Sequence, residues 1–157
     1  MPRLSRAAIA WALYDWAASA YALCILAGFF PILFESFWAS DLSASREIFW
    51  YGIFVSTASL IAAVIAPFLG ALADTGGSRK RWLVRFALIG MAATLGLVFV
   101  DRGNWPLAGS IFVVGTVGYY GATISYNALL PVVSSRENRH FVSGLGFAMG
   151  YLGGVLL

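Results

Sequence analysis

The chain is 157 residues long, and 61% of its residues are hydrophobic while only 11% are charged. Soluble domains carry about 25% charged residues, so this composition excludes an ordinary soluble protein and indicates one that lies in a membrane. A bilayer core needs about 20 residues per helix, which leaves room for five or six spans at most and excludes a complete large transporter. The ten Lys and Arg against seven Asp and Glu do not indicate a nucleic-acid partner, because in a membrane protein the placement of charges matters more than their sum.

Five apolar stretches predict an all-α integral membrane protein with five helices in one bundle, at residues 7–34, 48–73, 83–100, 106–131 and 141–157. Pro106 suits the first turn of the fourth helix, and Pro131 marks its other end. The third helix must begin near Trp82, since Arg85 can reach the headgroups from inside a span. That helix is apolar all round, which favours a peripheral position facing lipid.

The amino terminus has an alternative interpretation as a cleaved secretory signal. Arg3 and Arg6 precede an apolar stretch, and Ala18-Ser19-Ala20 imitates a cleavage site. Asp15 and Trp16 interrupt that stretch, however, and the hydrophobic run continues far beyond the supposed cut. We therefore expect the first helix to be retained.

Basic residues alternate with the helices. They precede the first predicted helix and follow the second and the fourth (Arg3, Arg6, Arg79, Lys80, Arg81, Arg85, Arg136 and Arg139), whereas the other loops hold only Arg46 and Arg102. Cytoplasmic loops are enriched in Lys and Arg, so the pattern predicts a multi-pass protein of the cell membrane with a cytoplasmic amino terminus. Tryptophans agree with this orientation: Trp38, Trp50 and Trp105 are expected at the outer interface, and Trp11 and Trp82 at the inner one.

The carboxy-terminal stretch is still apolar where the chain stops at Leu157, and no polar flank closes the fifth helix. We therefore expect a truncated, amino-terminal part of a longer protein, whose missing carboxy-terminal helices are partners of this chain.

Asp15 is the most informative single residue, because an ionisable group inside a span costs about 2.5–3.5 kcal/mol and is by default functional. Ser19 lies four residues further on and shares its helix face. One interpretation is that Asp15 bonds a neighbouring helix or caps a broken turn. The other is that Asp15 and Ser19 bind a solute or a coupling proton.

Tyr126 and Asn127 lie near the end of the fourth helix, at a depth similar to that of Asp15. The two polar groups can therefore meet across a cavity and line a solute pathway. The alternative is that Asn127 only holds helices together, since interhelical polar contacts in membranes contribute about 0.6–2 kcal/mol each.

Three glycines of the fifth helix recur every four residues, at Gly146, Gly150 and Gly154. Small residues at this spacing let two helix backbones approach closely, so we favour a packing role over a hinge. The single cysteine, Cys24, excludes a disulfide framework or a cysteine-rich metal site. Known hydrolase and metalloprotease motifs are absent from the sequence, and we expect no cofactor and no enzyme activity.

The stretch after the second helix carries Gly70, Asp74, Gly77 and Arg79 next to a basic triplet. It resembles the loop between helices two and three of the major facilitator superfamily, whose pattern is Gly-x-x-x-Asp-Arg/Lys-x-Gly-Arg-Arg/Lys. Thr75 and Ser78 replace basic positions of that pattern. The resemblance implies that these four residues form a cytoplasmic gate between two six-helix halves.

Two further stretches narrow the resemblance: Trp11-Ala-Leu-Tyr-Asp15-Trp-Ala-Ala-Ser19-Ala-Tyr21, and Tyr126-Asn127-Ala-Leu-Leu-Pro131 with the glycine-rich fifth helix. With the loop they resemble the autophagy-related vacuolar amino-acid effluxers and their bacterial relatives, also called the unknown major facilitator family. Ala18 stands where that family has asparagine. Tyr151 replaces the proline of the superfamily's antiporter signature, so antiport is not inferred.

The resemblance implies secondary transport of a small solute such as an amino acid, by a carrier of which this chain is a part that is inactive alone. The competing hypothesis is a small multi-pass membrane protein that binds partners through its glycine-rich fifth helix. An open reading frame with about seven more hydrophobic segments would favour the carrier, because alternating access needs two bundles.

Overall fold

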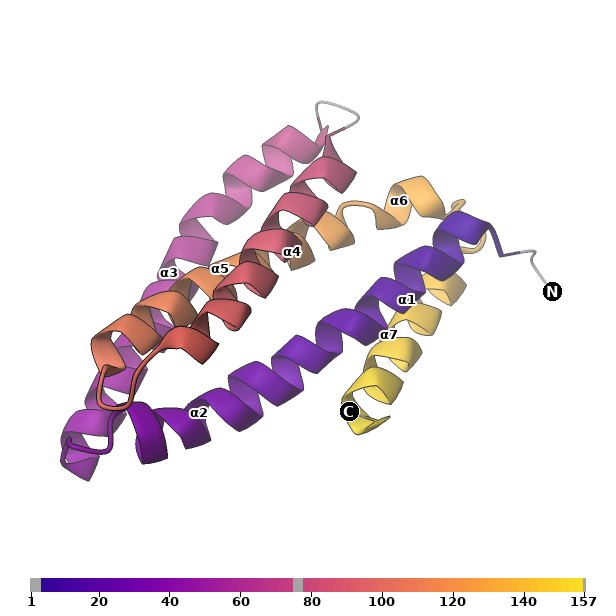
Figure 1. The fold of residues 1–157 in the computed structure, drawn as a ribbon. Helices are drawn as coiled ribbons and strands as arrows, with labels where there is room; N and C mark the ends of the chain where they lie inside the picture. Colours follow the sequence, from indigo (N-terminus) through magenta and orange to yellow (C-terminus); the bar gives the residue numbers. More distant parts are fainter. Residues whose placement is uncertain (1–3, 75–77, 157) are drawn as a thin grey trace.

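Every element in the described part of the chain is a helix. The computed structural model describes residues 4–74 and 78–156, and Figure 1 shows their arrangement. The elements are α1 (Arg6–Ala20), η1 (Tyr21–Phe29), α2 (Phe30–Leu33), η2 (Phe34–Trp38), α3 (Ala44–Asp74), α4 (Arg79–Gly96), η3 (Leu97–Phe99), α5 (Trp105–Asn127), α6 (Leu130–Val133) and α7 (Arg139–Leu156).

Four helices of the described part are long and apolar enough to cross a membrane. They are Arg6–Trp38, Ala44–Ala71, Arg79–Phe99 and Trp105–Val133. These helices confirm the predicted all-α membrane protein. The fifth expected span corresponds to α7, which is 18 residues long but starts with Arg139 and His140 and is rich in glycine. These residues lower its mean hydropathy, and its crossing of the membrane stays a prediction.

The first span is one continuous helix with a widened middle. Ser5 caps its start by accepting a hydrogen bond from the backbone N–H of Ala8, at 3.1 Å. The segment η1 is π-helical, and its last turn closes with the N–H of Phe30 on the carbonyl of Ile25. Pro31 follows directly; its ring would clash with the carbonyl four residues earlier in a regular α-helix. The wider turn accommodates the proline without breaking the span.

Proline positions also decide the limits of α5. Pro106 lies in its first turn, as predicted. The expected span to about Pro131 lies within one long helix, Trp105–Val133, in which α5 ends at Asn127 and the short helix α6 follows after a turn. Pro131 has no N–H for the carbonyl of Asn127, so the regular hydrogen-bond pattern stops there.

The third helix begins earlier than the expected span, at Arg79 rather than near Trp82. Its basic residues are therefore part of the helix and not of the preceding loop. Outside its contact with α5 the helix is largely exposed, with Leu88 at 56% and Leu95 at 67%. This exposure fits the lipid-facing position that its sequence predicts.

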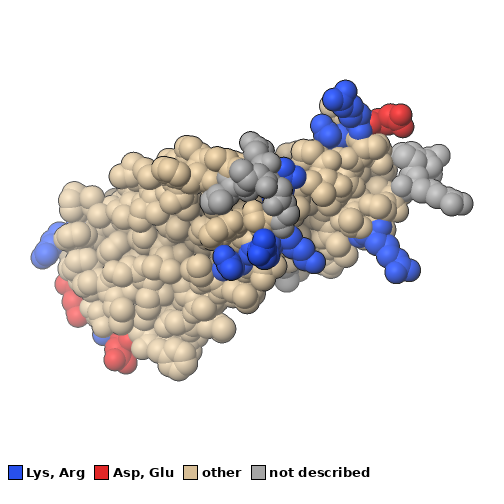
Figure 2. Space-filling model, turned by 90° about the horizontal axis from the view of Figure 1, so that it is seen from above, with Lys and Arg blue, Asp and Glu red and all other residues tan. Residues whose placement is uncertain are grey.

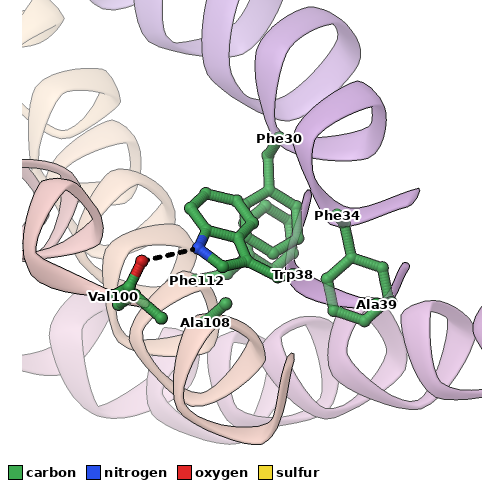
Figure 3. Packing of buried hydrophobic residues seen from close by; sticks show 7 residues of the cluster. All are labelled: Phe30, Phe34, Trp38, Ala39, Val100, Ala108 and Phe112. Carbon is green, nitrogen blue, oxygen red and sulfur yellow. Dashed lines mark hydrogen bonds between the residues drawn. The ribbon is translucent and has the colours of Figure 1, made fainter. Parts of the chain in front are cut away.

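The helices form two groups joined by the long first span (Figure 1). In one group, α5 packs against both α3 and α4; in the other, α7 lies along α1. The distal end of the first span joins the α3–α5 group through a cluster of aromatic and aliphatic side chains. Figure 3 shows this cluster, which comprises Phe30, Phe34, Trp38, Ala39, Val100, Ala108 and Phe112.

The distal cluster is held by stacking and by one buried hydrogen bond. The rings of Phe30 and Phe112 are stacked with centroids 3.8 Å apart. The indole N–H of Trp38 donates to the carbonyl of Val100 at 3.2 Å (Figure 3). This bond satisfies a polar group that the apolar cluster would otherwise leave unpaired, and it fixes the end of η2 relative to the end of η3.

Candidate functional site

Asp15 and Ser19 lie on the side of α1 that faces α7. A Cβ atom added at Gly150 of α7 would stand 3.1 Å from the Oδ2 atom of Asp15 and 3.1 Å from the Oγ atom of Ser19. The missing side chain of Gly150 therefore lets the backbone of α7 lie close to the carboxylate and the hydroxyl. Both polar residues are half-buried.

A cavity of about 480 Å³ adjoins these two residues. Its walls come from α7 and from α1 with the start of η1, and its lining residues are Asp15, Ser19, Ala22, Leu23, Phe147, Gly150, Tyr151, Gly154 and Val155. Small-molecule sites commonly occupy about 300–1,000 Å³ and combine apolar walls with a few polar groups. The cavity at Asp15 has this character.

The carboxylate of Asp15 has no hydrogen bond or ion pair within the described residues. It lies within electrostatic range of the hydroxyls of Tyr119 and Tyr126. A carboxylate in a membrane span is expected to have a partner or to mark a pathway. The geometry therefore does not provide the neighbouring-helix bond that would explain Asp15 as a structural residue.

Tyr126 connects α5 to α1 instead of lining the cavity at Asp15. Its ring is stacked on Trp11, with centroids 4.3 Å apart, and on Tyr14, at 5.2 Å. The indole N–H of Trp11 donates to the carbonyl of Tyr126 at 3.0 Å. Trp11 is buried in this contact, and its expected place at the inner interface stays a prediction.

The meeting of Asp15 with Tyr126 and Asn127 across one cavity is not seen. Neither residue of α5 is among those that line the cavity between α1 and α7. Asn127 is exposed at the last residue of α5. Tyr126 lies one turn of α7 away from the cavity, with its hydroxyl beside Gly146, whereas Asp15 faces Gly150.

Sequence reasoning missed a second cavity on the adjacent face of α1. It has a volume of about 170 Å³ and is lined by Tyr14, Ala17, Ala18, Tyr21, Ala87, Gly90, Met91, Tyr119 and Ala122. Tyr21 and Tyr119 are stacked across it with centroids 5.1 Å apart. The seven-residue spacing of Tyr14 and Tyr21, which puts both on one helix face, was the available signal.

The glycines of α7 approach α1 along one line. A Cβ at Gly146 would stand 2.5 Å from the ring of Trp11, and Gly150 faces Asp15 and Ser19. Gly154 lies against Leu23. The glycine spacing that predicted close packing thus faces α1 and the start of η1, and Gly150 and Gly154 also line the cavity.

The gate motif is only partly visible. Gly77 lies outside the described residues, as does the side chain of Asp74. Asp74 is the last residue of α3, and Arg79 is the first residue of α4. A Cβ at Gly70 would meet nothing within 4 Å.

Basic side chains gather at the end of the bundle where α1, α4 and α7 begin. The described members are Arg6, Arg79, Lys80, Arg81, Arg85, Arg136 and Arg139. Figure 2 shows Lys and Arg side chains around the grey segments of this end, with acidic side chains mainly at the far edge of the view. The asymmetry is the one from which the sequence predicts the orientation.

Metal binding finds no support in the described residues, which contain no group of three His, Cys, Asp or Glu side chains placed to hold an ion. Cys24 is a free cysteine in η1. The polar side chains that line the cavity are the carboxylate of Asp15 and the hydroxyls of Ser19 and Tyr151, which can bind a cationic or hydrogen-bonding solute.

Comparison with known proteins identifies similar chains. The family model for Atg22-like vacuole effluxers matches residues 51–140. YxiO of Bacillus subtilis, described as an MFS-type transporter, is 32% identical over 157 residues, which cover 99% of this chain and 37% of YxiO.

Two further relatives align with a smaller share of this chain. Autophagy-related protein 22 of Gibberella zeae is 26% identical over 84% of this chain and 24% of the fungal protein. Multidrug resistance protein MdtG of Dickeya zeae is 33% identical over 69% of this chain and 25% of MdtG. The chain thus spans about a third or less of these relatives. No solved structure matches it.

Proposed function

The chain belongs to the family of Atg22-like vacuole effluxers, and from this premise we propose that it forms the amino-terminal part of a secondary carrier for a small solute. The observation that carries the proposal is the unpaired carboxylate of Asp15 beside a cavity between two helices. Intramembrane carboxylates mark solute and proton pathways in transporters.

The solute that best suits this site is a small amine, and an amino acid is the first candidate. An ammonium group can pair with Asp15, while Ser19 can donate or accept a hydrogen bond. The apolar walls from Leu23, Phe147 and Val155 suit an uncharged side chain. A proton on Asp15 is the alternative partner, and it would couple transport to the proton gradient.

Alternating access requires two bundles that move around a central site. This chain spans 37% of YxiO, so we propose that transport needs further helices beyond those described. The carrier would lie in the cell membrane with the basic end of the bundle in the cytoplasm, following the distribution of Lys and Arg.

A substrate panel tests the proposed function directly. Proteoliposomes that contain the longer carrier and are loaded with one amino acid should accumulate the same labelled amino acid by counterflow. We expect accumulation for at least one small neutral amino acid and none in empty liposomes. Failure of every amino acid would contradict efflux of this solute class, and a sugar panel would then be the next comparison.

The exposed face of α7 favours a second candidate function. Phe147 is 67% exposed, Tyr151 77% and Val155 82%. This face can pack against further helices of the same carrier or against another membrane protein. Purification of the protein as a stable complex with a different polypeptide, without counterflow activity, would favour the second candidate.

The gate motif gives a further prediction. Replacing Asp74 with Ala should change the labelling rate of a cysteine at Arg136 by about fivefold, because the proposed latch would no longer hold one state of the carrier. The measurement uses a membrane-impermeant maleimide on inside-out vesicles, in a background with Cys24 replaced by Ala.

Asp101→Ala is the matched control, because Asp101 precedes α5 at the opposite end of the bundle. It should leave the labelling rate unchanged. Equal rates for Asp74→Ala and the unsubstituted carrier would argue against a gate at this loop.

A further inference from the structure

The first turns of α4 form a strongly basic surface. Arg79, Lys80, Arg81 and Arg85 fall within seven residues, and the sequence has no acidic residue from 78 to 100. Lys80, Arg81 and Arg85 are exposed. Figure 2 shows basic side chains along this part of the molecule. Basic residues in a loop are explained by their effect on membrane orientation, but Arg85 lies inside α4 and not in a loop.

Arg85 has a defined position on α4. It stands six residues after the first residue of the helix, which corresponds to about 9 Å along the axis at 1.5 Å per residue. Its guanidinium carbon lies 5.1 Å from the ring centroid of Trp82. No carboxylate of the described residues forms an ion pair with it. The ring therefore orients the cation while its N–H groups stay free to donate.

An apolar groove extends from Arg85 along the same helix. Its volume is about 300 Å³, and it is lined by Trp82, Arg85, Phe86, Leu88 and Ile89. The exposed strip continues toward the other end of α4 with Met91 at 55% and Leu95 at 67% exposed. The opposite side of the helix packs on α5, where a Cβ added at Gly90 would stand 3.4 Å from the carbonyl oxygen of Gly115.

We propose that this groove binds one anionic phospholipid, with its phosphate on Arg85 and one acyl chain along Phe86, Leu88 and Ile89. A guanidinium forms bidentate hydrogen bonds with phosphate, and basic sites beside membrane helices recognise anionic headgroups. The exposed apolar strip beside Arg85 is long and apolar enough to hold an acyl chain. A free phosphate ion has no acyl chain and would leave this strip uncovered. The inference depends only on the membrane location of α4 and not on the transport activity.

Native mass spectrometry of the protein purified from membranes tests the assignment. The protein is incubated with phosphatidylglycerol or with phosphatidylcholine, and the retained lipid is counted. We expect one phosphatidylglycerol to remain bound and phosphatidylcholine to dissociate. Arg85→Gln should weaken retention of phosphatidylglycerol about tenfold, since hydrogen bonds to charged groups contribute strongly.

Arg46→Gln is the matched control, because Arg46 is an exposed arginine in the first turn of α3 at the other end of the bundle. It should retain the lipid as the unsubstituted protein does. Ile89→Trp keeps every charge but fills the groove, and it should weaken retention as well. This second variant separates the acyl-chain contact from the charge.

Three outcomes would overturn the proposal. Equal retention of phosphatidylglycerol by Arg85→Gln and the unsubstituted protein would show that the cation is not the headgroup contact. Equal retention of both lipids would show that charge does not select the ligand. Displacement of the lipid by soluble glycerol phosphate would assign the site to free phosphates rather than to a membrane lipid.

Discussion

Replacing Asp15 with Asn is expected to lower solute transport by about 10- to 100-fold, because hydrogen bonds to charged groups contribute about 1.5–3 kcal/mol. The amide keeps the shape of the side chain but removes its negative charge from the cavity between α1 and α7. The measurement is the initial counterflow rate in proteoliposomes that contain the longer carrier, with the amino acid that the substrate panel identifies.

The control must remove one carboxylate charge at a different position of the same span. Glu35→Gln does so, because Glu35 is exposed in η2 at the distal end of the first helix. It should transport at the unsubstituted rate. Both variants should insert into the membrane equally well, since removal of an intramembrane charge does not oppose insertion.

Substrate-dependent thermal stabilisation separates binding from coupling. If Asp15 binds the ammonium group, Asp15→Asn should lose the stabilisation by the substrate together with the transport. If Asp15 carries only the coupling proton, the stabilisation should remain while the transport driven by a proton gradient is lost. Unchanged transport would remove Asp15 from the mechanism in either case.

The all-helical fold and four of the five expected long helices could be predicted because apolar length is a direct requirement of the bilayer. Pro106 marked the start of α5 for a local reason, since its fixed φ and missing N–H suit a first turn. The same local rule could not say that the helix continues through Pro31 but is interrupted before Pro131. Pro31 lies where Phe30 and Phe34 pack into the distal cluster, and the span widens there but continues.

Which residues meet at the candidate site was harder to predict from the sequence. The four-residue spacing put Asp15 and Ser19 on one face of a helix, but it could not say which helix lies opposite. That depends on packing between residues more than one hundred positions apart, such as the contact of Gly150 with Asp15. Tyr126 lies within electrostatic range of Asp15, but its ring is stacked on Trp11 and Tyr14 and does not line the cavity.

The glycines of α5 show how one available signal was overlooked. Gly115, Gly118 and Gly121 recur every three residues and therefore lie near one face. All three are buried. A Cβ at Gly115 would stand 3.5 Å from the Cβ atom of Ala93, and one at Gly121 would stand 2.5 Å from the ring of Phe86. These glycines form a close contact with α4, like the one that the spacing in α7 predicted for that helix.

Gly118→Ala is expected to destabilise the protein by about 1–3 kcal/mol, the usual effect of overpacking a close contact. A Cβ at Gly118 would stand 2.7 Å from the backbone nitrogen of Gly90 and 2.9 Å from the carbonyl oxygen of Phe86. Both are backbone atoms, so no side-chain rotation can relieve the clash. The methyl group must push α4 and α5 apart, and close backbone approach is a main source of helix association in membranes.

Gly52→Ala is the matched control for this substitution. Gly52 is an exposed residue inside α3, and a Cβ there would meet nothing within 4 Å. Ala favours a helix over Gly by about 1 kcal/mol, so the control should keep or raise the stability. The free energy of unfolding of each variant is measured by reversible unfolding of the purified protein in a denaturing detergent. The difference between the two variants then reports the packing cost at Gly118, because the helix propensity of Ala contributes to both.

Equal unfolding free energies for Gly118→Ala and Gly52→Ala would contradict the close contact between α4 and α5. A loss in both variants would instead indicate a general intolerance of helix substitutions. Gly118→Val extends the series, because two more methyl groups meet the same backbone of α4 and should lower the stability further. An ordered loss from Gly to Ala to Val at position 118, without loss at position 52, is the result that the geometry requires.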